Sequence, residues 1–418
     1  MRYQMMVTFL SLFLLTITSP SVKADELVTV KLVNYLGNKD HIEFYLTGNF
    51  NSLDPTFSWQ EGVKYSLTVQ ESSFILEGNG LTHTIEGPLF LIPERYDQHH
   101  VVRINRRPYL GAMEFRLEDE QWIRPVNQLP LEDYLKGVVP FEVYPTWGIE
   151  TLKAQSLAAR TYAVTHMRKE MDDTISFQVY GGYAWYPSTT KAVEETRGEV
   201  VTFKNRLIEA FYSASNGGVT ESNANVWGGN PIHYYPIKTD PYDPVHPWEF
   251  ELHQTQINPG VFQGDQEDWW DSLEEKDRKV SETMKKWLER KGYGGDLKIL
   301  SIPRFELSKV RRSSQRAVKG SIEVEFLERL IDGTVLFQTI TLDDVPLSHI
   351  RPMLGGNLLK SYFIDSLTLE DDVFIMRGKG YGHGVGMSQW GAHYMAEKGK
   401  SYEDIIHFYF PGTTITHH

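Results

Sequence analysis

One run of residues, Ile149 to Met167, constrains the fold of this chain more than any other. It contains no Gly or Pro and is rich in Ala and Leu, so it predicts a helix of about five turns. Small or apolar side chains fill most of its length, which is typical of a helix buried on most sides. Such a helix needs protein packed around it, so we expect the rest of the chain to be organised around this run.

The same run contains four polar side chains, those of Lys153, Gln155, Arg160 and Tyr162. Lys153 and Arg160 are seven residues apart and therefore lie on one face of the helix. Buried charges need partners. The two cations could pair with acidic residues as part of the scaffold, or they could face a cleft and hold an oxygen-rich ligand.

A single glutamate, Glu142, precedes this helix in an apolar setting, with VVPF before it and VYP after it. Desolvation at such a position is expected to raise the pKa of the carboxyl. A carboxyl whose pKa is near neutral can deliver a proton, as a general acid must. The alternative is that Glu142 lies on an exposed turn beside Pro140 and Pro145 and has no chemical role.

Residues 1–24 have the pattern of a targeting segment. Arg2 precedes an apolar run from Met5 to Ile17, and Ala24 ends a small-residue cleavage site. The run is short for a membrane span of ~20 residues. We therefore expect a signal peptide, with an uncleaved N-terminal anchor as the alternative and as the only membrane contact.

Composition excludes several classes of function. There is no cysteine, which rules out disulfides, thiolate metal sites and a cysteine nucleophile, and the net charge of -13 argues against nucleic acid as a partner. Aromatic residues make up 13% of the chain and could form stacking platforms for sugars or fill a core. We expect an exported, extracytoplasmic protein at the cell wall of a Gram-positive bacterium, either secreted or N-terminally anchored.

The predicted fold class is α+β. Residues 25–120 contain short strand-like runs separated by turn signals, and we predict a β-rich region that serves as a scaffold or a glycan-binding module. Residues 121–418 are predicted to form a mixed α/β catalytic core around the central buried helix. Within this core, residues 245–295 include a helix with alternating charges and a solvated face, which predicts either part of a substrate-side lobe or an inserted helical subdomain. Residues 297–369 return to strand-like runs.

Three loops supply further candidate site residues. Gln178 and Tyr180 lie in an aromatic loop that could line a sugar groove or pack on the core. Ser215 belongs to a polar Gly-Gly loop of a kind that often carries function. Asp240 and Asp243 could supply a second carboxylate, although turn formation explains each Asp-Pro pair equally well.

Five glycines alternate through residues 378–386. In an extended segment this spacing would bare the backbone to another chain or a ligand. His383 could bind a ligand or handle a proton there, or it could be a satisfied structural histidine. We predict a helix from Ser388 to Lys398 and a last helix that begins with a capping box at Ser401 and Asp404.

Two long segments together resemble one family. GVVPFEVYPTWGIETLKAQSLAARTYAV at 137–164 and GKGYGHGVGMSQWGAHYMAEKG at 378–399 are similar to the sporulation stage II protein D / amidase enhancer (SpoIID/LytB) family. QVYGG, ASNGGVTES and TDPYD lie between them in the expected order, so the resemblance covers roughly 106–413. It implies a peptidoglycan lytic transglycosylase of cell-wall remodelling, including spore engulfment, that favours glycan strands without stem peptides.

The resemblance also implies roles for single residues. The catalytic glutamate of the family falls on Glu142, and its basic substrate-contacting positions fall on Lys153 and Arg160. Some members hold a metal through His and Cys just before the Gly-Gly loop; this chain has Tyr212 and Ser213 there, so no metal and no cofactor is predicted. The full set of predicted substrate-binding residues is Lys153, Gln155, Arg160, Tyr162, Gln178, Tyr180, Ser215, His383 and Gln389.

The implied reaction needs one acid/base. Glu142 would protonate the glycosidic oxygen between MurNAc and GlcNAc, and the 6-hydroxyl of MurNAc would attack to give a 1,6-anhydro end. One alternative is a non-catalytic peptidoglycan-binding enhancer of an N-acetylmuramoyl-L-alanine amidase. Another is a hydrolase that uses two carboxylates and water. The expected partners are peptidoglycan glycan strands, with a cell-wall amidase or other engulfment proteins as candidates.

Overall fold

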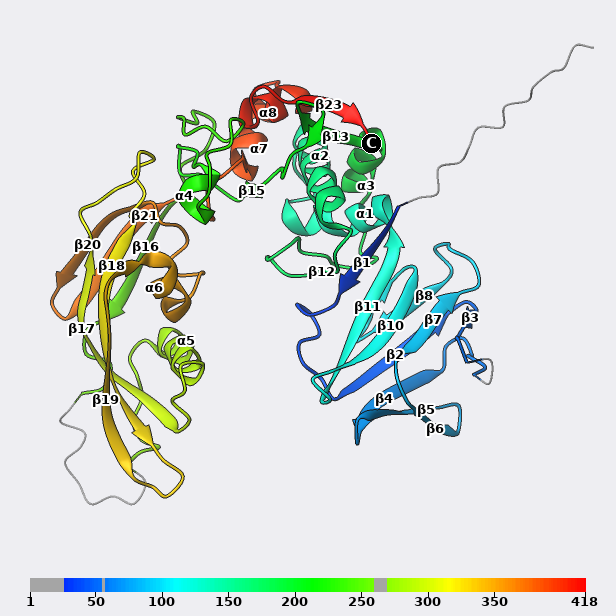
Figure 1. Ribbon diagram of the computed structural model, residues 1–418, viewed down its shortest axis with the longest axis horizontal. Helices are drawn as coiled ribbons and strands as arrows, with labels where there is room; N and C mark the ends of the chain where they lie inside the picture. The colour runs from blue at the N-terminus through cyan, green and yellow to red at the C-terminus, as the bar shows by residue number, and fades with distance from the viewer. Residues whose placement is uncertain (1–25, 55–56, 259–268) are drawn as a thin grey trace, which may run out of the picture.

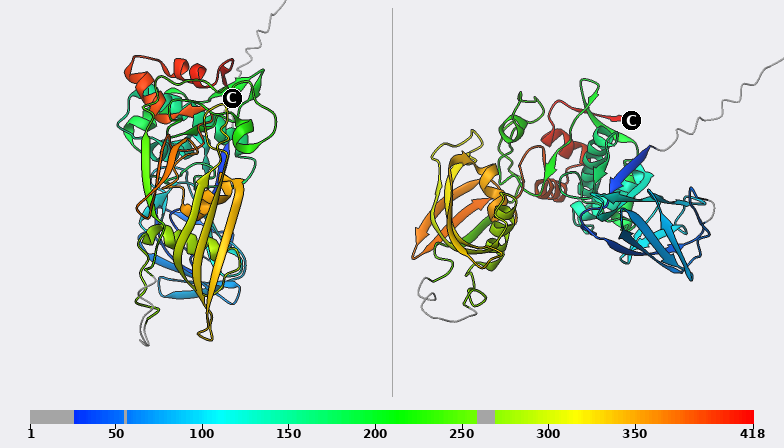
Figure 2. Two further views of the ribbon diagram at one scale, coloured as in Figure 1. Left: turned by 90° about the vertical axis from the view of Figure 1, so that its left-hand side faces the viewer. Right: turned by 60° about the horizontal axis from the view of Figure 1, so that its bottom comes forward.

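The computed structural model describes residues 26–54, 57–258 and 269–418, so the predicted leader at 1–24 lies outside the described residues. The chain combines eight helices in these ranges with several sheets, which confirms the predicted α+β class. Two β-rich lobes flank a helical centre, and a second view keeps them apart (Figures 1 and 2). No helix in the described ranges is long and apolar enough to cross a membrane.

The N-terminal lobe consists of two six-stranded sheets. The first has the order β12-β1-β11-β10-β7-β3, with β12 (Met171–Asp172), β1 (Leu27–Lys31), β11 (Trp122–Pro130), β10 (Ala112–Glu118), β7 (Leu89–Pro93) and β3 (Phe50–Asn51). The second has the order β6-β5-β4-β2-β8-β9, with β6 (Leu81–Ile85), β5 (Ser73–Gly78), β4 (Lys64–Gln70), β2 (His41–Thr47), β8 (Val101–Ile104) and β9 (Arg107–Tyr109). Alternate residues of β2 are buried, as expected for a strand with one face on a core, and Phe44 of β2 stacks on Phe115 of β10 at 5.2 Å between ring centroids.

The helical centre begins with α1 (Leu131–Glu142), α2 (Ile149–His166) and α3 (Pro187–Glu195). Most residues of α2 are buried, and its bounds confirm the predicted helix to within one residue. Gly148 is the N-cap of α2 and makes no side-chain capping bond. Helix α1 ends at Glu142 because Val143 is extended, which places the glutamate at the mouth of the turn between the two helices.

The C-terminal part of the chain completes this centre. Helices α7 (Gln389–Glu397) and α8 (Tyr402–Tyr409) pack on α2. Ser388 caps α7, and the predicted capping box of Ser401 and Asp404 at the start of α8 is confirmed. The remaining short elements here are α4 (Asn223–Trp227), the sheet of β14 (Arg206–Leu207), β13 (Glu199–Phe203) and β23 (Thr414–His417), and the parallel pair of β15 (Tyr212–Ser213) and β22 (Met387–Ser388).

The second lobe, residues 247–379, is here called the distal lobe. One sheet joins β16 (Pro247–His253), β21 (Val373–Lys379) and β20 (Ile364–Glu370), and the other joins β17 (Asp296–Leu307), β18 (Lys319–Arg329) and β19 (Val335–Pro346). Helices α5 (Arg278–Glu289) and α6 (Leu347–Leu354) pack beside them around a separate apolar core. The helix predicted within 245–295 is α5, and it belongs to a larger and mostly β lobe instead of a separate helical subdomain.

The alternating glycines do not form the extended segment that the sequence suggested. Gly380, Gly382, Gly384 and Gly386 all have positive φ, between 73° and 105°. A Cβ on Gly384 would lie 2.2 Å from Nη2 of Arg316, and one on Gly386 would lie 2.1 Å from the carbonyl oxygen of Phe211. Close approach was expected, but the groups that approach are other parts of this chain.

Candidate active site

A cleft of about 960 Å³ lies between the helical centre and the distal lobe. The helical centre contributes side chains that include Glu142, Tyr162, Tyr212, His383 and Gln389. The distal lobe contributes others, among them Arg312, Arg316, Leu347, Arg351 and Tyr362. The site is thus assembled from segments far apart in the sequence, and the distal lobe forms a whole wall of it.

Glu142 reaches this cleft from the end of α1. Its Oε1 accepts a hydrogen bond of 2.8 Å from the backbone N–H of Val179. Burial raises the pKa of the Glu142 carboxyl to about 7, against the opposing effect of hydrogen bonds from Val179, Gln389 and Tyr212. This agrees with the direction predicted from its apolar neighbours, and it contradicts the alternative of an exposed turn.

Tyr212 connects Glu142 to the interior through a chain of hydrogen bonds. The Tyr134 hydroxyl donates to Oε1 of Gln178 at 3.3 Å, and Nε2 of Gln178 donates to the Tyr212 hydroxyl at 2.9 Å. Because that hydroxyl accepts from Gln178, its own proton is free to be donated to Glu142, to which it is hydrogen-bonded. Sequence reasoning missed this role, and the only signal was the position of Tyr212 just before the Gly-Gly loop.

Tyr212→Phe is expected to raise the pKa of Glu142 further above its ordinary range, because the lost hydrogen bond favours the charged carboxylate. A ¹³C NMR titration of the Glu142 carboxyl measures this directly and needs no activity. Tyr381→Phe is the matched control, since Tyr381 also lines the cleft but its hydroxyl donates to Asn357. A pKa that stays constant or falls in Tyr212→Phe would contradict the assigned hydrogen bond.

His383 lines the cleft, but its ring nitrogens are engaged by the backbone. Its Nδ1 accepts from the N–H of Val385 at 3.0 Å, and the ring also hydrogen-bonds to the backbone of Tyr212. Burial, together with the positive charges of Arg316 and Arg351, lowers the pKa of His383 to about 4. His383 is therefore neutral at physiological pH, and the geometry favours the structural alternative over proton transfer.

Lys153 and Arg160 do not line the cleft. Arg160 is fully buried, and its guanidinium donates to both carboxylate oxygens of Glu132 at 2.8 Å. Nζ of Lys153 lies 2.8 Å from the Glu195 carboxylate. Both cations are thus paired with acidic residues of α1 and α3. These contacts favour the alternative in which Lys153 and Arg160 are part of the scaffold.

The remaining predicted residues divide into two groups. Tyr162 and Gln389 line the cleft. Gln155, Gln178, Tyr180 and Ser215 are buried beside it and support other groups. Their hydrogen-bond partners are Gln389 for Gln155 at 3.4 Å, Tyr212 for Gln178 at 2.9 Å, Asn127 for Tyr180 at 2.8 Å and Asp243 for Ser215 at 2.8 Å.

The carboxylates of Asp240 and Asp243 accept hydrogen bonds from residues of the Gly-Gly loop. Asp240 accepts from Nδ2 of Asn216 and from the Tyr409 hydroxyl, both at 2.7 Å. Asp243 accepts from the backbone N–H of Asn216 at 2.9 Å and from Oγ of Ser388 at 2.6 Å. Both are buried within these bonds, so the structure does not offer either as the second carboxylate of a hydrolase.

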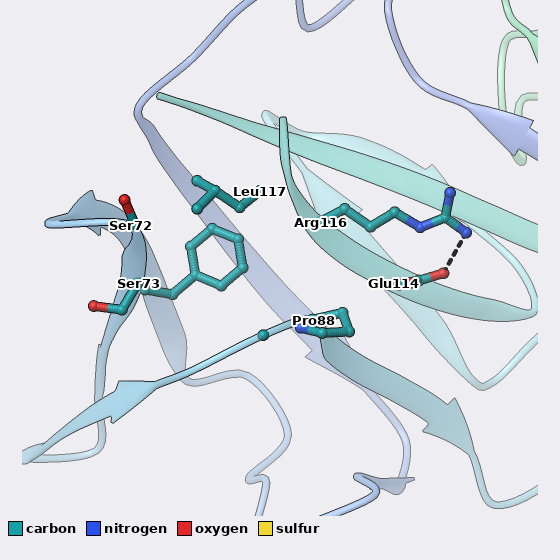
Figure 3. A pocket seen from close by; sticks show the side chains of 8 residues that line it. Ser72, Ser73, Pro88, Glu114, Arg116 and Leu117 are labelled. Atoms are coloured by element: carbon teal, nitrogen blue, oxygen red, sulfur yellow. Dashed lines mark hydrogen bonds and ion pairs between the residues drawn. The ribbon is translucent and has the colours of Figure 1, made fainter. Parts of the chain in front are cut away.

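A second, smaller pocket of about 320 Å³ lies in the N-terminal lobe (Figure 3). Its wall includes Ser72, Ser73, Pro88 and Leu117, with Arg116 at one side. That arginine is already paired with Glu114 at 2.7 Å and with Glu170. We therefore place the candidate chemistry in the larger cleft, where a carboxyl with a raised pKa is present.

Comparisons with known proteins identify relatives of this chain. A family model described as a stage II sporulation protein (SpoIID) matches residues 119–203, which include Glu142 and α2. The amidase enhancer of Bacillus subtilis (strain 168) is 38% identical over 370 residues, which are 88% of this chain and 52% of that protein. The chain thus spans about half the length of that relative.

Two sporulation proteins are similar over more of their own length. Stage II sporulation protein D of Bacillus amyloliquefaciens is 30% identical over 313 residues, covering 70% of this chain and 75% of that protein. Stage II sporulation protein D of Bacillus subtilis (strain 168) is 27% identical over 326 residues, covering 70% and 76%. The chain therefore belongs to the sporulation stage II protein D / amidase enhancer (SpoIID/LytB) family.

Proposed function

We propose that this protein is a peptidoglycan lytic transglycosylase that cleaves the MurNAc-β-1,4-GlcNAc bond and leaves a 1,6-anhydroMurNAc end. The observation that carries the proposal is the carboxyl of Glu142 on the cleft, with a pKa of about 7. A group with this pKa is protonated and deprotonated in similar amounts near neutral pH. It can therefore act first as a general acid and then as a general base.

In the proposed reaction, protonated Glu142 donates its proton to the glycosidic oxygen as the C1–O bond breaks. Positive charge develops at C1 of MurNAc, as in ordinary glycosidases. The 6-hydroxyl of the same sugar attacks C1, and the Glu142 carboxylate takes the proton that this hydroxyl loses. The bonds from Val179 and Tyr212 stabilise the carboxylate between the two steps and hold it in one orientation.

The hydrolase alternative would need a second carboxylate to activate water. Among the described residues that line the cleft, Glu221 is the other carboxylate. It is buried and accepts hydrogen bonds from Nδ2 of Asn225 at 2.7 Å and from the Ser314 hydroxyl. These bonds hold Glu221 as an acceptor and favour a supporting role, so we prefer the mechanism with one carboxylate.

A non-catalytic role is the second candidate, favoured by the likeness to a protein named amidase enhancer. In that case the cleft would bind glycan strands outside the cytoplasm, and a cell-wall amidase would be the partner. Mass spectrometry of peptide-free glycan after incubation with the protein distinguishes the three candidate functions. Anhydro ends support the transglycosylase and reducing ends support a hydrolase, whereas intact strands together with stimulated amidase support the enhancer.

The cleavage rate is expected to fall as the pH rises through about 7. Glu142 must enter the reaction protonated, and its pKa of about 7 sets the pH above which the acid form is lost. The measurement is kcat/KM for anhydro-end release across about two pH units on either side of this value. A rate that rises through the same range would contradict a general-acid role for Glu142.

A further inference from the structure

Arg316 lines the distal-lobe wall of the cleft, and two nitrogens of its guanidinium group make no hydrogen bond to the described residues. Its side chain is almost fully buried, at 4% exposure. Its Nη2 donates to the carbonyl oxygens of Asn216 at 2.8 Å and Val219 at 3.0 Å. Nε and Nη1 have no hydrogen-bond partner among the described residues. Burying unpaired donors of a cation costs free energy, so this arrangement needs an explanation beyond packing.

Glu221, the acidic residue beside Arg316, does not make a hydrogen bond to its guanidinium group. Oε2 of Glu221 is 3.9 Å from Nη1 of Arg316, which is longer than a hydrogen bond. Glu221 already accepts from the backbone N–H of Ser222 at 2.8 Å and from Asn225 and Ser314. Burial lowers the pKa of Arg316 to about 10, so the guanidinium is still a cation at neutral pH.

Two more arginines lie on the same wall, and we call Arg312, Arg316 and Arg351 together the arginine wall. Arg312 and Arg351 are half-buried, so unlike Arg316 they have surface with which to contact a ligand directly. Glu221 is the acidic residue among them, and His383 is neutral because burial lowers its pKa to about 4. The wall is thus positive in a protein whose net charge is -13, which favours an anionic ligand at this place.

The arginine wall is close to Glu142 through a few linked residues. Tyr212 hydrogen-bonds to Glu142, and the hydroxyl of the next residue, Ser213, accepts from the N–H of Gly384 at 3.2 Å. Gly384 in turn packs directly on the guanidinium of Arg316, where a Cβ would lie 2.2 Å from Nη2. Glu142 and the three arginines also line the same cleft, so a glycan strand bound in it would lie between them.

We propose that the arginine wall binds the free lactyl carboxylate of a muramic acid residue that has lost its stem peptide. This inference rests on the proposed action on peptidoglycan glycan. A carboxylate can accept charge-assisted hydrogen bonds from the arginines, whereas a stem peptide converts the same group into a neutral amide. The wall would thus determine specificity for peptide-free muramic acid.

The test compares two ligands that differ in this group alone. Both are GlcNAc-MurNAc tetrasaccharides without peptide, one with free lactyl carboxylates and one with lactyl methylamides. Isothermal titration calorimetry with the Glu142→Gln chain, which needs no cleavage, should show about tenfold or tighter binding of the acid. Arg316→Met in the same background should bring the two Kd values close together. Arg304→Met removes an arginine of the distal lobe that pairs with Glu306 and Asp343 and should keep the difference.

Arg316 also anchors the Gly-Gly loop, so circular dichroism must show that Arg316→Met is folded. If it is not, Arg351→Met and Arg312→Met decide, and each should reduce the preference for the acid. Equal binding of acid and methylamide by the Glu142→Gln chain, or a preference unchanged in the folded arginine variants, would overturn the inference. The Glu142→Gln chain could prefer the acid while the unmutated chain releases no anhydro ends. That result would support this inference and contradict the proposed transglycosylase function.

Discussion

Glu142→Gln is expected to abolish the release of saccharides with 1,6-anhydroMurNAc ends from peptide-free glycan. The amide is nearly the same size as the carboxyl but cannot donate a proton to the glycosidic oxygen or accept one from the 6-hydroxyl. General acid–base catalysis contributes roughly 10²- to 10⁴-fold to a rate, so we expect at least about a hundredfold loss. Liquid chromatography with mass spectrometry of the digest measures it. Release at the normal rate by this variant would remove Glu142 from the mechanism.

The same variant should not be destabilised. The pKa of Glu142 is about 7 in the folded chain and 4.5 as its ordinary value, so the folded state holds a proton that the unfolded state releases between these values. This proton contributes to the free energy of unfolding in full below pH 4.5, and the contribution is lost as the pH rises through about 7. Gln has no charge to desolvate, so above pH 7 the variant should unfold at the same temperature or a higher one.

Glu195→Gln is the control for both measurements, because this glutamate pairs with Lys153 outside the cleft. It should leave the cleavage rate unchanged. If Glu142→Gln lowers both the unfolding temperature and the rate, then the loss of activity reflects a damaged fold, and the assignment of Glu142 as the acid/base fails.

Local sequence predicted those parts of the site whose causes are local. Helix α2 follows from an unbroken run of helix formers. The direction of the Glu142 pKa shift was predicted from its apolar neighbours, although the groups that contact the carboxyl, from Val179, Tyr212 and Gln389, come from distant segments. The capping box at the start of α8 depends on two residues three positions apart. Helix α2 and the capping box are decided by neighbours in the chain, so a sequence pattern was enough to find them.

The missed parts depend on pairing across long distances. Tyr212 reaches the site through the parallel bridge of β15 with β22, which joins segments about 175 residues apart. Arg316 reaches it because the loop between β17 and β18 folds back against the Gly-Gly loop. Residues 245–295 were expected to form a helical unit because α5 has strongly patterned charges, and the strand-like runs that follow them predicted β17, β18 and β19. No local pattern shows that this helix and these strands share one apolar core.

Lys153 and Arg160 each pair with an acidic residue, which is one of the two alternatives that the sequence left open for them. Which side of α2 meets the cleft is set by the helices that pack on it, and these bring Glu132 and Glu195 to the two cations. The resemblance to a family gave these positions a substrate-contacting role. The contacts seen here give them a structural role, and stability measurements can decide between the two.

Arg160→Met is expected to destabilise the fold by about 3–5 kcal/mol, the usual cost of breaking a buried ion pair from one side. Arg160 is fully buried, and its loss leaves the Glu132 carboxylate, which is 12% exposed, without its partner. The carbonyl oxygen of Val193 also loses a hydrogen bond of 3.0 Å. Urea denaturation measures the change. Lys153→Met is the matched comparison and should cost about 0–1 kcal/mol, because its partner Glu195 is 40% exposed.

Substrate affinity distinguishes this structural role from a direct contact. Under conditions where Arg160→Met is fully folded, its KM for glycan should match that of the unmutated chain, because the guanidinium does not line the cleft. Adding Glu132→Leu should restore part of the lost stability, since the second change removes the unpaired buried carboxylate. A variant that keeps its stability but has a raised KM would instead show that Arg160 turns towards the glycan when substrate binds, and that the pairing with Glu132 is broken in the complex.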